Sequence, residues 1–379
     1  MTRPSTNRAK DPRDTDPHVI DFVRCSYLGL ENHPTIVAGA IEAIEAQRSL
    51  YGSRARTRFI CDLLRELEEL LSLIFGARVL TFSSRALANF HSMPILASGQ
   101  LTGGRKPVVV FDHSAHISLA YHKPMVAKET QVETISHNDI DALERLCRAN
   151  LVTAYVCEGV YSIGSYSPIK ELRQLQERYG LFLYIDDTHG ISIFGHQGEG
   201  FARSLFPQAI GERTIITASL AKGFGASGAA LMLGGADHET TFRRHSIPCA
   251  SSAAPNLAAI GAALGSCKVH RSAELSQRQR LLAQRIDFFD RHVATAEQGN
   301  SLPIRRIAVG SETKAIAIAR RLLDLGLYTS VTSFPTAGYG RAGVRLCITA
   351  EHEFHEIGQL CNGILEKVAE IAGKPYPLR

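Results

Sequence analysis

The sequence predicts an α/β protein with a mostly parallel β-sheet that is covered by helices on both faces. Two observations favour this class. Short apolar runs typical of buried strands alternate with amphipathic segments typical of helices, and polar side chains follow several of these runs where the strands would end. The 379 residues, of which 45% are hydrophobic, suit one large α/β unit with a smaller appended α+β domain.

Strands and helices are expected to alternate along most of the chain. Helices are predicted at residues 35–47, 62–75, 138–149 and 169–179, and a further helix opens at 83–89. Strands are predicted at residues 78–82, 107–112, 154–160, 183–186 and 214–219. Beyond residue 255 the pattern predicts one long helix at about 256–292, followed by short strands and by helices at 312–325 and 350–371.

Composition divides the chain into four parts. Residues 1–17 are polar and rich in Arg, Asp, Thr and Pro, so we expect a disordered tail. An N-terminal segment at 18–50, a large domain at 51–265 and a small C-terminal domain at 266–379 follow. No segment resembles the apolar core of a signal peptide, and no run approaches the roughly 18 consecutive apolar residues that a membrane span needs. We therefore expect no membrane span.

Charge and cysteine content exclude further classes. The net charge of +5 comes from interspersed charges of both signs without a Lys/Arg block, so no nucleic-acid partner is expected. The eight cysteines are scattered and include no C-x-x-C pair. This distribution indicates reduced thiols in a cytoplasmic protein rather than a disulfide framework or a metal site.

Lys222 follows the predicted strand at 214–219 and precedes a Gly-Phe-Gly turn. An ammonium group flanked by apolar strands loses favourable hydration unless something uses it. A desolvated lysine has a depressed pKa and can form a Schiff base with a carbonyl cofactor such as pyridoxal phosphate. The alternative is an ordinary lysine at a strand end that reaches into solvent.

Two other strand ends favour the cofactor. Asp186 ends an apolar run, where a pyridoxal enzyme needs a carboxylate to keep the ring nitrogen protonated. His189, three residues further on, could reach the phenolic oxygen of the ring, and His116 after another buried strand could stack on the ring face. Each histidine alone is better explained as a structural residue. The order strand–His, strand–Asp-x-x-His, strand–Lys favours a catalytic site.

Several other groups could hold anions. Ser84 precedes a predicted helix, and a helix N-terminus favours phosphate. The basic loop at 51–58 is either a solvated turn or an anion-holding rim. Arg345 lies within an apolar strand, where its guanidinium would hold either a substrate carboxylate or a structural ion-pair partner.

Together these motifs resemble the α-oxoamine synthases, a family of fold-type-I pyridoxal phosphate enzymes. The resemblance extends from about residue 27 to residue 355. The sequence motifs that carry it are Tyr27-Leu-Gly-Leu followed by His33-Pro34, His137-Asn-Asp, Asp186-Asp-Thr-His-Gly and Ser219-Leu-Ala-Lys222-Gly-Phe-Gly. The sequences at 218–222 and at 331–335 are also similar to those of the bacterial α-aminoketone autoinducer synthases. This similarity indicates a specialised biosynthetic role.

The resemblance implies a fold-type-I architecture, with a mostly parallel seven-stranded sheet in a large domain that binds pyridoxal 5'-phosphate. It implies a catalytic set of Lys222, His116, Asp186 and His189, with Lys222 joined to the cofactor and Ser219 holding its phosphate. The other implied cofactor contacts are Ser84, Arg85, Ala86, Ser162, Ser251 and Ser252. The last two would come from the neighbouring subunit, so a homodimer with shared active sites is implied. Arg345, Cys25 and Tyr27 would contact the substrate.

The implied reaction is the condensation of an amino acid with an acyl thioester, carried by coenzyme A or a carrier protein, with loss of carbon dioxide. The product would be an α-aminoketone. Three departures from the family pattern bear on it: Ser84-Arg85-Ala86 replaces Ser-Gly-aromatic, the basic loop is shorter, and Cys25 replaces an asparagine. A lyase or aminotransferase that uses the same site without an acyl donor therefore stays open, as does a non-catalytic scaffold.

Overall fold

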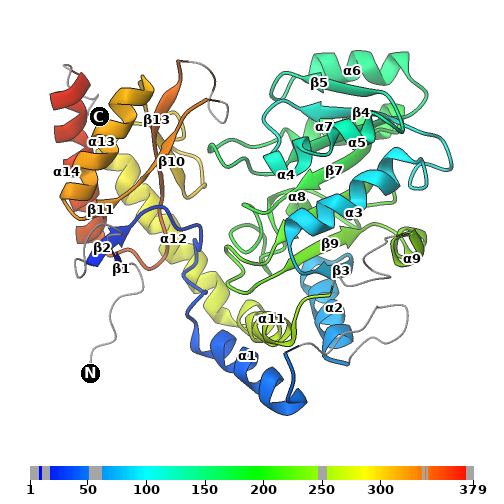
Figure 1. The fold of residues 1–379 in the computed structure, drawn as a ribbon, viewed down its shortest axis with the longest axis horizontal. Coiled ribbons are helices and arrows are strands. Elements are labelled where there is room, and N and C mark those ends of the chain that lie inside the picture. Colours follow the sequence, from blue (N-terminus) through cyan, green and yellow to red (C-terminus); the bar gives the residue numbers. More distant parts are fainter. Residues whose placement is uncertain are drawn as a thin grey trace. The chain divides into compact units, whose positions relative to one another are not determined.

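The computed structural model describes residues 8–10, 18–50, 62–245, 254–334, 338 and 340–372, and Figure 1 shows its elements. The chain forms two compact units. The larger consists of Leu30–Tyr161 and Tyr166–Leu275. The smaller consists of Met1–Gly29, Ser162–Ser165 and Ser276–Arg379. Three predicted features lie outside the described residues: the basic loop at 51–58, Ser251 and Ser252.

A seven-stranded sheet with the order β3-β9-β8-β7-β6-β4-β5 forms the centre of the larger unit. Strands β4 to β8 run parallel to one another, whereas β9 is antiparallel to both β3 and β8. The predicted mostly parallel sheet is therefore confirmed. The strands are β3 (Arg78–Phe82), β4 (Val108–Asp112), β5 (Val132–Ile135), β6 (Thr153–Glu158), β7 (Phe182–Asp186), β8 (Thr214–Ser219) and β9 (Ala229–Leu233).

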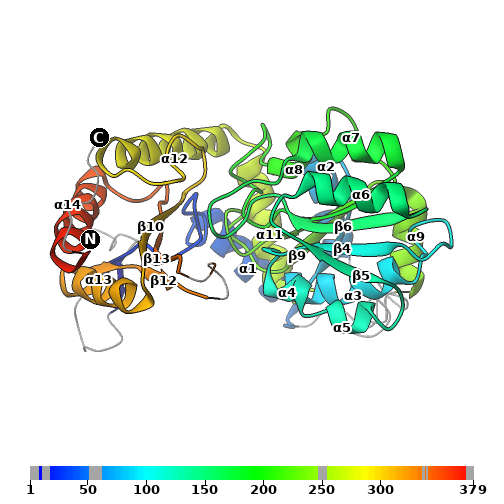
Figure 2. The same cartoon turned by 90° about the horizontal axis from the view of Figure 1, so that it is seen from above.

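Helices cover both faces of this sheet (Figure 2). One face packs against α2 (Asp62–Phe75), α6 (Ile140–Ala149), α7 (Ile169–Tyr179), α8 (Phe201–Ser204) and α11 (Leu257–His270). The other packs against α3 (Arg85–Ala97), α4 (Ile117–Ala120), α5 (Lys123–Val126) and α9 (Ala236–His245). Strand β7 is apolar because both of its faces are buried. Leu183 and Ile185 pack into the core on the α2 face of the sheet, and Tyr184 packs into the core on the α3 face.

In its described residues, the smaller unit contains two three-stranded sheets and three helices. One sheet has the order β1-β2-β11, with β1 (Arg8–Lys10), β2 (His18–Asp21) and β11 (Leu327–Tyr328). The other has the order β10-β13-β12, with β10 (Ile304–Gly310), β13 (Ala342–Cys347) and β12 (Ser330–Thr332). The helices are α12 (Ala273–His292), whose first turn belongs to the larger unit, α13 (Glu312–Asp324) and α14 (Phe354–Ala372).

Two sequence-based expectations were wrong. The single helix expected at 256–292 is two helices, α11 and α12, because Ser272 interrupts the run and its Oγ accepts a hydrogen bond from the Glu274 N–H at the start of α12. Part of the expected disordered tail, Arg8–Lys10, pairs with β2 as an antiparallel strand. Among the helices that the structure describes, none is long and apolar enough to cross a membrane.

Small residues allow close contact between α1 (Pro34–Gln47) and α11. Gly39 of α1 and Gly261 of α11 face each other so closely that a Cβ atom on Gly261 would lie 2.1 Å from the carbonyl oxygen of Gly39. Because the obstacle is backbone, a rotamer change cannot relieve the overlap. The two helices must separate to accept any larger residue.

His270 ends α11 behind the turn that carries Lys222. Its side chain is buried, its Nδ1 donates to the Ser266 carbonyl oxygen at 2.9 Å, and its Nε2 accepts from the Ser192 hydroxyl at 2.8 Å. Its ring stacks on Phe224, with ring centroids 4.3 Å apart. Burial lowers the pKa of His270 to about 4. The folded protein therefore excludes a proton that the unfolded chain accepts.

Gly261→Ala should destabilise the protein by about 1–3 kcal/mol, the usual cost of overpacking a close contact. The measurement is the midpoint of thermal or urea unfolding. Gly358→Ala is the matched control, since Gly358 lies in helix α14 with nothing within 4 Å of its would-be Cβ. The control should be neutral or stabilising by about 0.5–1 kcal/mol. Equal stability of both variants would contradict this account of the α1–α11 contact.

The free energy of unfolding should fall as the pH drops from about 6.5 towards 4, because only the unfolded chain binds a proton at His270 in this range. At pH 5, protonation of His270 in the unfolded chain alone lowers the free energy of unfolding by about 2 kcal/mol. His270→Gln should lower stability at pH 7 but reduce the loss between pH 7 and pH 5. Denaturant unfolding at the two pH values measures this loss. The exposed His113→Gln variant should keep the wild-type pH dependence, and an unchanged dependence in His270→Gln would refute the prediction.

Candidate functional site

The carboxyl ends of parallel strands in the larger unit bring the predicted catalytic residues to one edge of the sheet. His116 follows β4, Asp186 ends β7, His189 lies in the turn after β7, and Lys222 follows β8. Neighbouring parallel strands end at the same edge, which explains why residues far apart in sequence come together here. The structure thus groups these four side chains within one unit.

Lys222 and His189 form the most direct contact, with 2.8 Å between Nζ and Nε2. Two features fix the turn that carries Lys222. The Ser219 N–H donates to Thr188 Oγ1 at 3.0 Å, which ties the end of β8 to the turn after β7. Gly225 has a φ of 74°, and a side chain there would overlap Leu30. His189 is buried, so the lysine amine meets an imidazole that is held within the fold.

Asp186 is fully buried, and its two carboxylate oxygens have different surroundings. Oδ1 accepts a hydrogen bond from the Thr188 N–H at 3.1 Å. Oδ2 lies 3.1 Å from Nη1 of Arg85 and forms an ion pair with it, but the angles do not make a hydrogen bond. Within the described residues, Oδ2 is therefore a buried acceptor with unused hydrogen-bonding capacity.

Sequence analysis missed Glu158, which lies directly opposite Asp186 in the β6–β7 register. Burial and the charge of Asp186 raise the pKa of Glu158 well above its usual range. The signal was present in the sequence. Glu158 follows the apolar run Ala-Tyr-Val-Cys in the same way as Asp186 follows its own apolar run, and a carboxylate in that position indicates a functional edge.

His116 is held in one tautomer by its local backbone. It precedes α4, and its Nδ1 accepts from the Ser118 N–H at 3.0 Å, so the neutral ring carries its proton on Nε2. A hydrogen-bonded chain from Tyr184 through Asn89 to the Ser118 hydroxyl supports this corner. Burial and the positive charges of Arg85 and Lys222 lower the pKa of His116 to about 4, although Asp186 opposes the shift. His116 is therefore neutral at pH 7.

The predicted phosphate-binding residues are only partly described. Ser84 caps α3, where its Oγ accepts from the Leu87 N–H at 3.2 Å, and Ala86 lies in the first turn of the same helix. Ser219 ends β8, and its Oγ accepts from the Ala221 N–H at 3.2 Å. These two hydroxyls lie at the carboxyl edge of the sheet. Ser251 and Ser252 lie outside the described residues, so the structure gives no position for them.

The smaller unit holds the other predicted residues: Cys25, Tyr27, Ser162 and Arg345. Arg345, on β13, donates from Nε to the Ser162 carbonyl oxygen at 2.8 Å, and its Nη2 lies 3.7 Å from Cys25 Sγ. Tyr27 is fully buried, and burial raises the pKa of its phenol well above the usual range. Among the described residues no Asp or Glu forms an ion pair with Arg345, so the structural ion pair considered for it is not observed.

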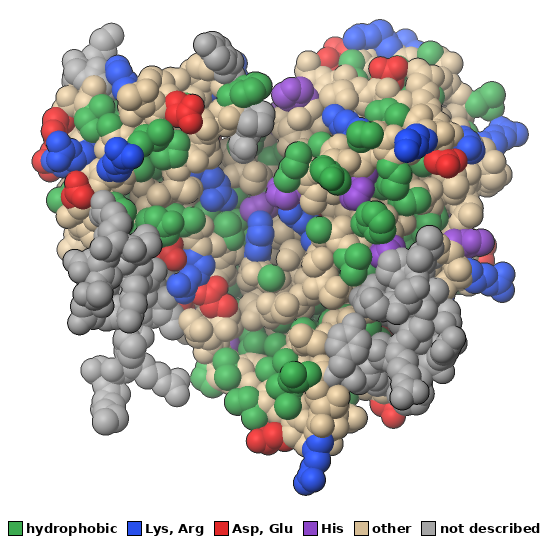
Figure 3. Space-filling view, viewed as in Figure 1, with side chains coloured by type: hydrophobic (Ala, Val, Ile, Leu, Met, Phe, Trp, Pro, Cys, Tyr) green, Lys and Arg blue, Asp and Glu red, His purple; other side chains and the backbone are tan. Residues whose placement is uncertain are grey.

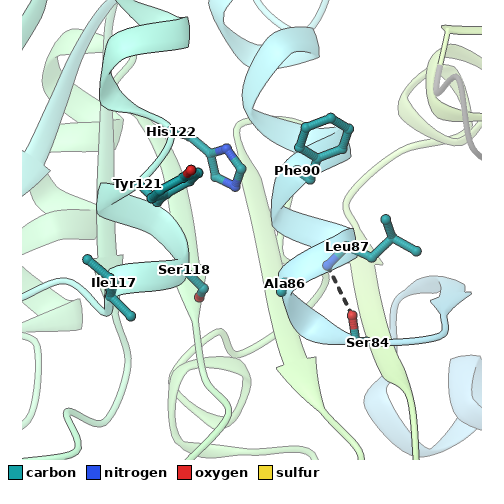
Figure 4. A pocket seen from close by; sticks show the side chains of 8 residues that line it. All are labelled: Ser84, Ala86, Leu87, Phe90, Ile117, Ser118, Tyr121 and His122. Carbon is teal, nitrogen blue, oxygen red and sulfur yellow. Dashed lines mark hydrogen bonds between the residues drawn. The ribbon is translucent and has the colours of Figure 1, made fainter.

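An apolar groove of about 530 Å³ lies between α3 and α4 (Figure 4). Phe90 projects from α3 on one side, and Tyr121 and His122 lie on the other. Ile117 and Tyr121 are among the most exposed large hydrophobic side chains of the described chain, at 69% and 78%. Figure 3 shows hydrophobic and histidine side chains close together on the visible face of the larger unit. The groove is lined by Ser84, Ala86, Leu87, Phe90, Ile117, Ser118, Tyr121 and His122.

The turn at 137–139 supports the site rather than forming it. Asp112, at the end of β4, accepts from His137 Nδ1 at 3.1 Å and from the Asn138 N–H at 2.9 Å. Asp139 caps α6 by accepting from the Ala142 N–H at 2.9 Å. These contacts anchor the loop that leads from β5 into α6.

The residues at the sheet edge fit pyridoxal phosphate by their chemistry. Lys222 supplies the primary amine, and Asp186 Oδ2 is a buried acceptor able to bind a protonated ring nitrogen. His116 supplies a flat, neutral ring. One feature opposes the fit: the guanidinium of Arg85 contacts both Asp186 and His116. Arginine side chains are long and flexible, so this group can leave without moving the helix.

Comparisons with known proteins identify the family. The sequence model of aminotransferase class I and II matches residues 36–364. An 8-amino-7-oxononanoate synthase of Pseudescherichia vulneris is 31% identical over 360 residues, which cover 91% of this chain and 88% of that protein. The corresponding enzyme of Klebsiella pneumoniae (strain 342) is 29% identical over 354 residues, with coverage of 91% and 88%.

Solved structures share the fold. A serine palmitoyltransferase with its PLP internal aldimine superposes with a TM-score of 0.82 at 20% identity and covers 94% of this chain and 88% of its own. The 8-amino-7-oxononanoate synthase of Francisella tularensis gives a TM-score of 0.77 at 20% identity, with coverage of 93% and 98%. The predicted fold class and the predicted resemblance to the α-oxoamine synthases are confirmed. The chain belongs to the aminotransferase class I and II family.

Proposed function

We propose that the chain is a pyridoxal phosphate-dependent acyltransferase that condenses an amino acid, or an amino-acid-derived donor, with an acyl thioester. The reaction is decarboxylative and gives an α-aminoketone, in a specialised biosynthetic pathway. The observation that carries the proposal is the contact between Lys222 and His189 beside the buried Asp186, at the edge where an α/β sheet binds its ligands. The relatives named 8-amino-7-oxononanoate synthase support the same reaction class.

Pyridoxal phosphate, when bound, supplies a carbonyl group for the amine of the substrate and a ring that accepts electrons from the α-carbon. The fully buried Asp186 would hold the positive charge of the ring nitrogen through Oδ2. His116, neutral at pH 7, would lie against the ring without adding a competing charge. Ser84 and Ser219, with Ser251 and Ser252 of a second copy, are the proposed phosphate ligands.

Lys222 is the proposed base for the α-proton of the substrate. Its Nζ lies at hydrogen-bond distance from His189 Nε2, so a proton taken up by the amine can be shared with the imidazole. His189 is buried, whereas Lys222 is only partly buried, so the imidazole is the more shielded member of the pair. His189 and His116 are also the groups placed to steady negative charge on the acyl oxygen as the thioester is attacked.

Arg345 is the proposed ligand of the substrate carboxylate, since its guanidinium lacks an acidic partner among the described residues. Cys25 and Tyr27 are the other proposed substrate ligands. The shared phosphate site makes a homodimer part of the proposal. A cytoplasmic location is also proposed; the absence of disulfides among the described cysteines supports it.

A second candidate is a lyase or aminotransferase that uses the same residues without an acyl donor. The observation that favours it is Arg85, because a glycine and an aromatic residue normally form the cofactor and thioester surface where this chain has Arg85-Ala86. Both candidates need Lys222 and Asp186. They differ only in whether a thioester is consumed.

Lys222→Ala should remove the visible absorbance of the bound cofactor and lower turnover by about 10²-fold or more, because both the covalent anchor and the base are lost. Borohydride reduction followed by peptide mapping should place the cofactor on the peptide that contains Lys222. Lys106→Ala, at an exposed surface ion pair, is the control and should behave as wild type. Borohydride labelling of another lysine in the wild-type protein would contradict the assignment.

Turnover should require an amino acid and an acyl thioester together, with one thiol and one carbon dioxide released per product. The measurement is parallel detection of free thiol and of carbon dioxide over a panel of amino acids and acyl-coenzyme A chain lengths. Heat-inactivated protein and the Lys222→Ala variant provide the background. Amino-acid decarboxylation or transamination at a rate independent of every thioester would instead establish the second candidate.

A further inference from the structure

Arg85 bridges two residues that the cofactor ring needs. It is the first residue of α3, and its side chain is only 12% exposed. Nη1 lies 3.1 Å from Asp186 Oδ2, while Nη2 lies 3.0 Å from Nδ1 and 3.1 Å from Nε2 of His116. A planar cation therefore contacts both the carboxylate and the imidazole, from a position where a glycine would contribute no side chain at all.

The bridge is electrostatically favourable for the cofactor-free protein. Asp186 is fully buried, and a buried carboxylate without a counter-charge is strongly destabilising. Glu158, the neighbour of Asp186 on β6, is a second acidic residue and supplies no positive charge. Lys222 is engaged with His189. Arg85 is the cation that forms an ion pair with Asp186 among the described residues.

The contact between Arg85 and Asp186 has poor hydrogen-bond geometry. The contact with Asp186 Oδ2 lacks hydrogen-bond geometry, and Arg85 Nη1 has no hydrogen-bond partner among the described residues. On the other side, His116 Nδ1 already accepts from the Ser118 N–H, and Nε2 of the neutral ring carries a proton. Arg85 thus holds Asp186 mainly through charge, and its hydrogen-bonding contact with His116 competes with the bond that Nδ1 already accepts. A protonated ring nitrogen would offer Asp186 Oδ2 both a charge and a directed hydrogen bond.

We propose that Arg85 is an internal competitor for pyridoxal phosphate: its guanidinium occupies Asp186 and His116 in the cofactor-free protein and must be displaced when the cofactor binds. This inference rests on the proposed function only in that the cofactor is pyridoxal phosphate. Arg85 stabilises the empty site and weakens cofactor binding. Its displacement needs only rotation about its own side-chain bonds, because the residue starts α3 and the helix axis need not move.

The test measures cofactor affinity and stability rather than turnover. Cofactor-free wild type, Arg85→Ala and Arg85→Lys are titrated with pyridoxal phosphate by absorbance and fluorescence, and melted with and without it. Arg85→Ala should bind the cofactor about tenfold more tightly or better, because a charged contact to a buried carboxylate no longer has to be broken. Its cofactor-free form should melt at a lower temperature, and its melting temperature should rise more on cofactor addition.

Arg85→Lys keeps the charge on a side chain that cannot bridge two partners, so its affinity should fall between those of wild type and Arg85→Ala. Arg148→Ala, on the exposed surface of α6, is the matched control and should change neither affinity nor the cofactor-induced stabilisation. If Arg85→Ala fails to fold, Arg85→Lys alone tests the proposal, because it must still bind pyridoxal phosphate more tightly than wild type does.

Unchanged or weaker cofactor binding in both Arg85 variants would overturn the proposal, because it would show that Arg85 does not compete with the cofactor or helps to hold it. Failure of wild type and of both variants to bind pyridoxal phosphate would overturn the proposed function itself. Borohydride labelling of Lys222 in wild type separates the two cases: labelled protein without tighter binding in the variants contradicts only the role of Arg85.

Discussion

The need to compensate one buried carboxylate determines the arrangement of this site. Asp186 is removed from water at the end of β7, and a charge in such a position must be met by a cation or by hydrogen bonds. The Thr188 N–H meets one oxygen and Arg85 the other. The neighbouring groups respond to this arrangement: burial and the nearby Asp186 raise the pKa of Glu158, whereas burial and the positive charges of Arg85 and Lys222 lower the pKa of His116.

The parallel sheet makes that compensation possible. Glu158, Asp186 and Thr217 lie side by side in the registers of β6, β7 and β8, so groups from three separate βα units reach the same edge. The Ser219 N–H to Thr188 contact then links the turn after β7 to the turn that carries Lys222. Displacement of one turn would therefore move both the carboxylate and the amine.

Sequence reasoning predicted what depends on local pattern and missed what depends on tertiary contact. The amphipathic α2 and the apolar strands β3 and β8 were predicted with their observed bounds, because their periodicity is complete within the segment. The edge strand β5 is only partly buried, so its sequence lacked an apolar run.

The break at Ser272 depends on one capping hydroxyl, and the grouping of Ser162–Ser165 with the smaller unit depends on contacts distant in sequence. The catalytic candidates were predictable by type and order, whereas the bridge from Arg85 to Asp186 was not, since a long side chain at a helix start has many directions open to it.

The two departures from the family pattern in α3 act on different surroundings. The Arg85 side chain contacts Asp186 and His116, whereas Ala86 lines the apolar groove with Phe90 and Tyr121. The proton in the proposed reaction is moved by a different pair, Lys222 and His189, which contact each other directly. A chain that had lost catalysis would be free to lose this pair and the buried carboxylate, whose isolated burial is destabilising. Their presence beside the changes at Arg85 and Ala86 argues for an enzyme whose cofactor and acyl-donor binding have diverged while its proton chemistry has been kept.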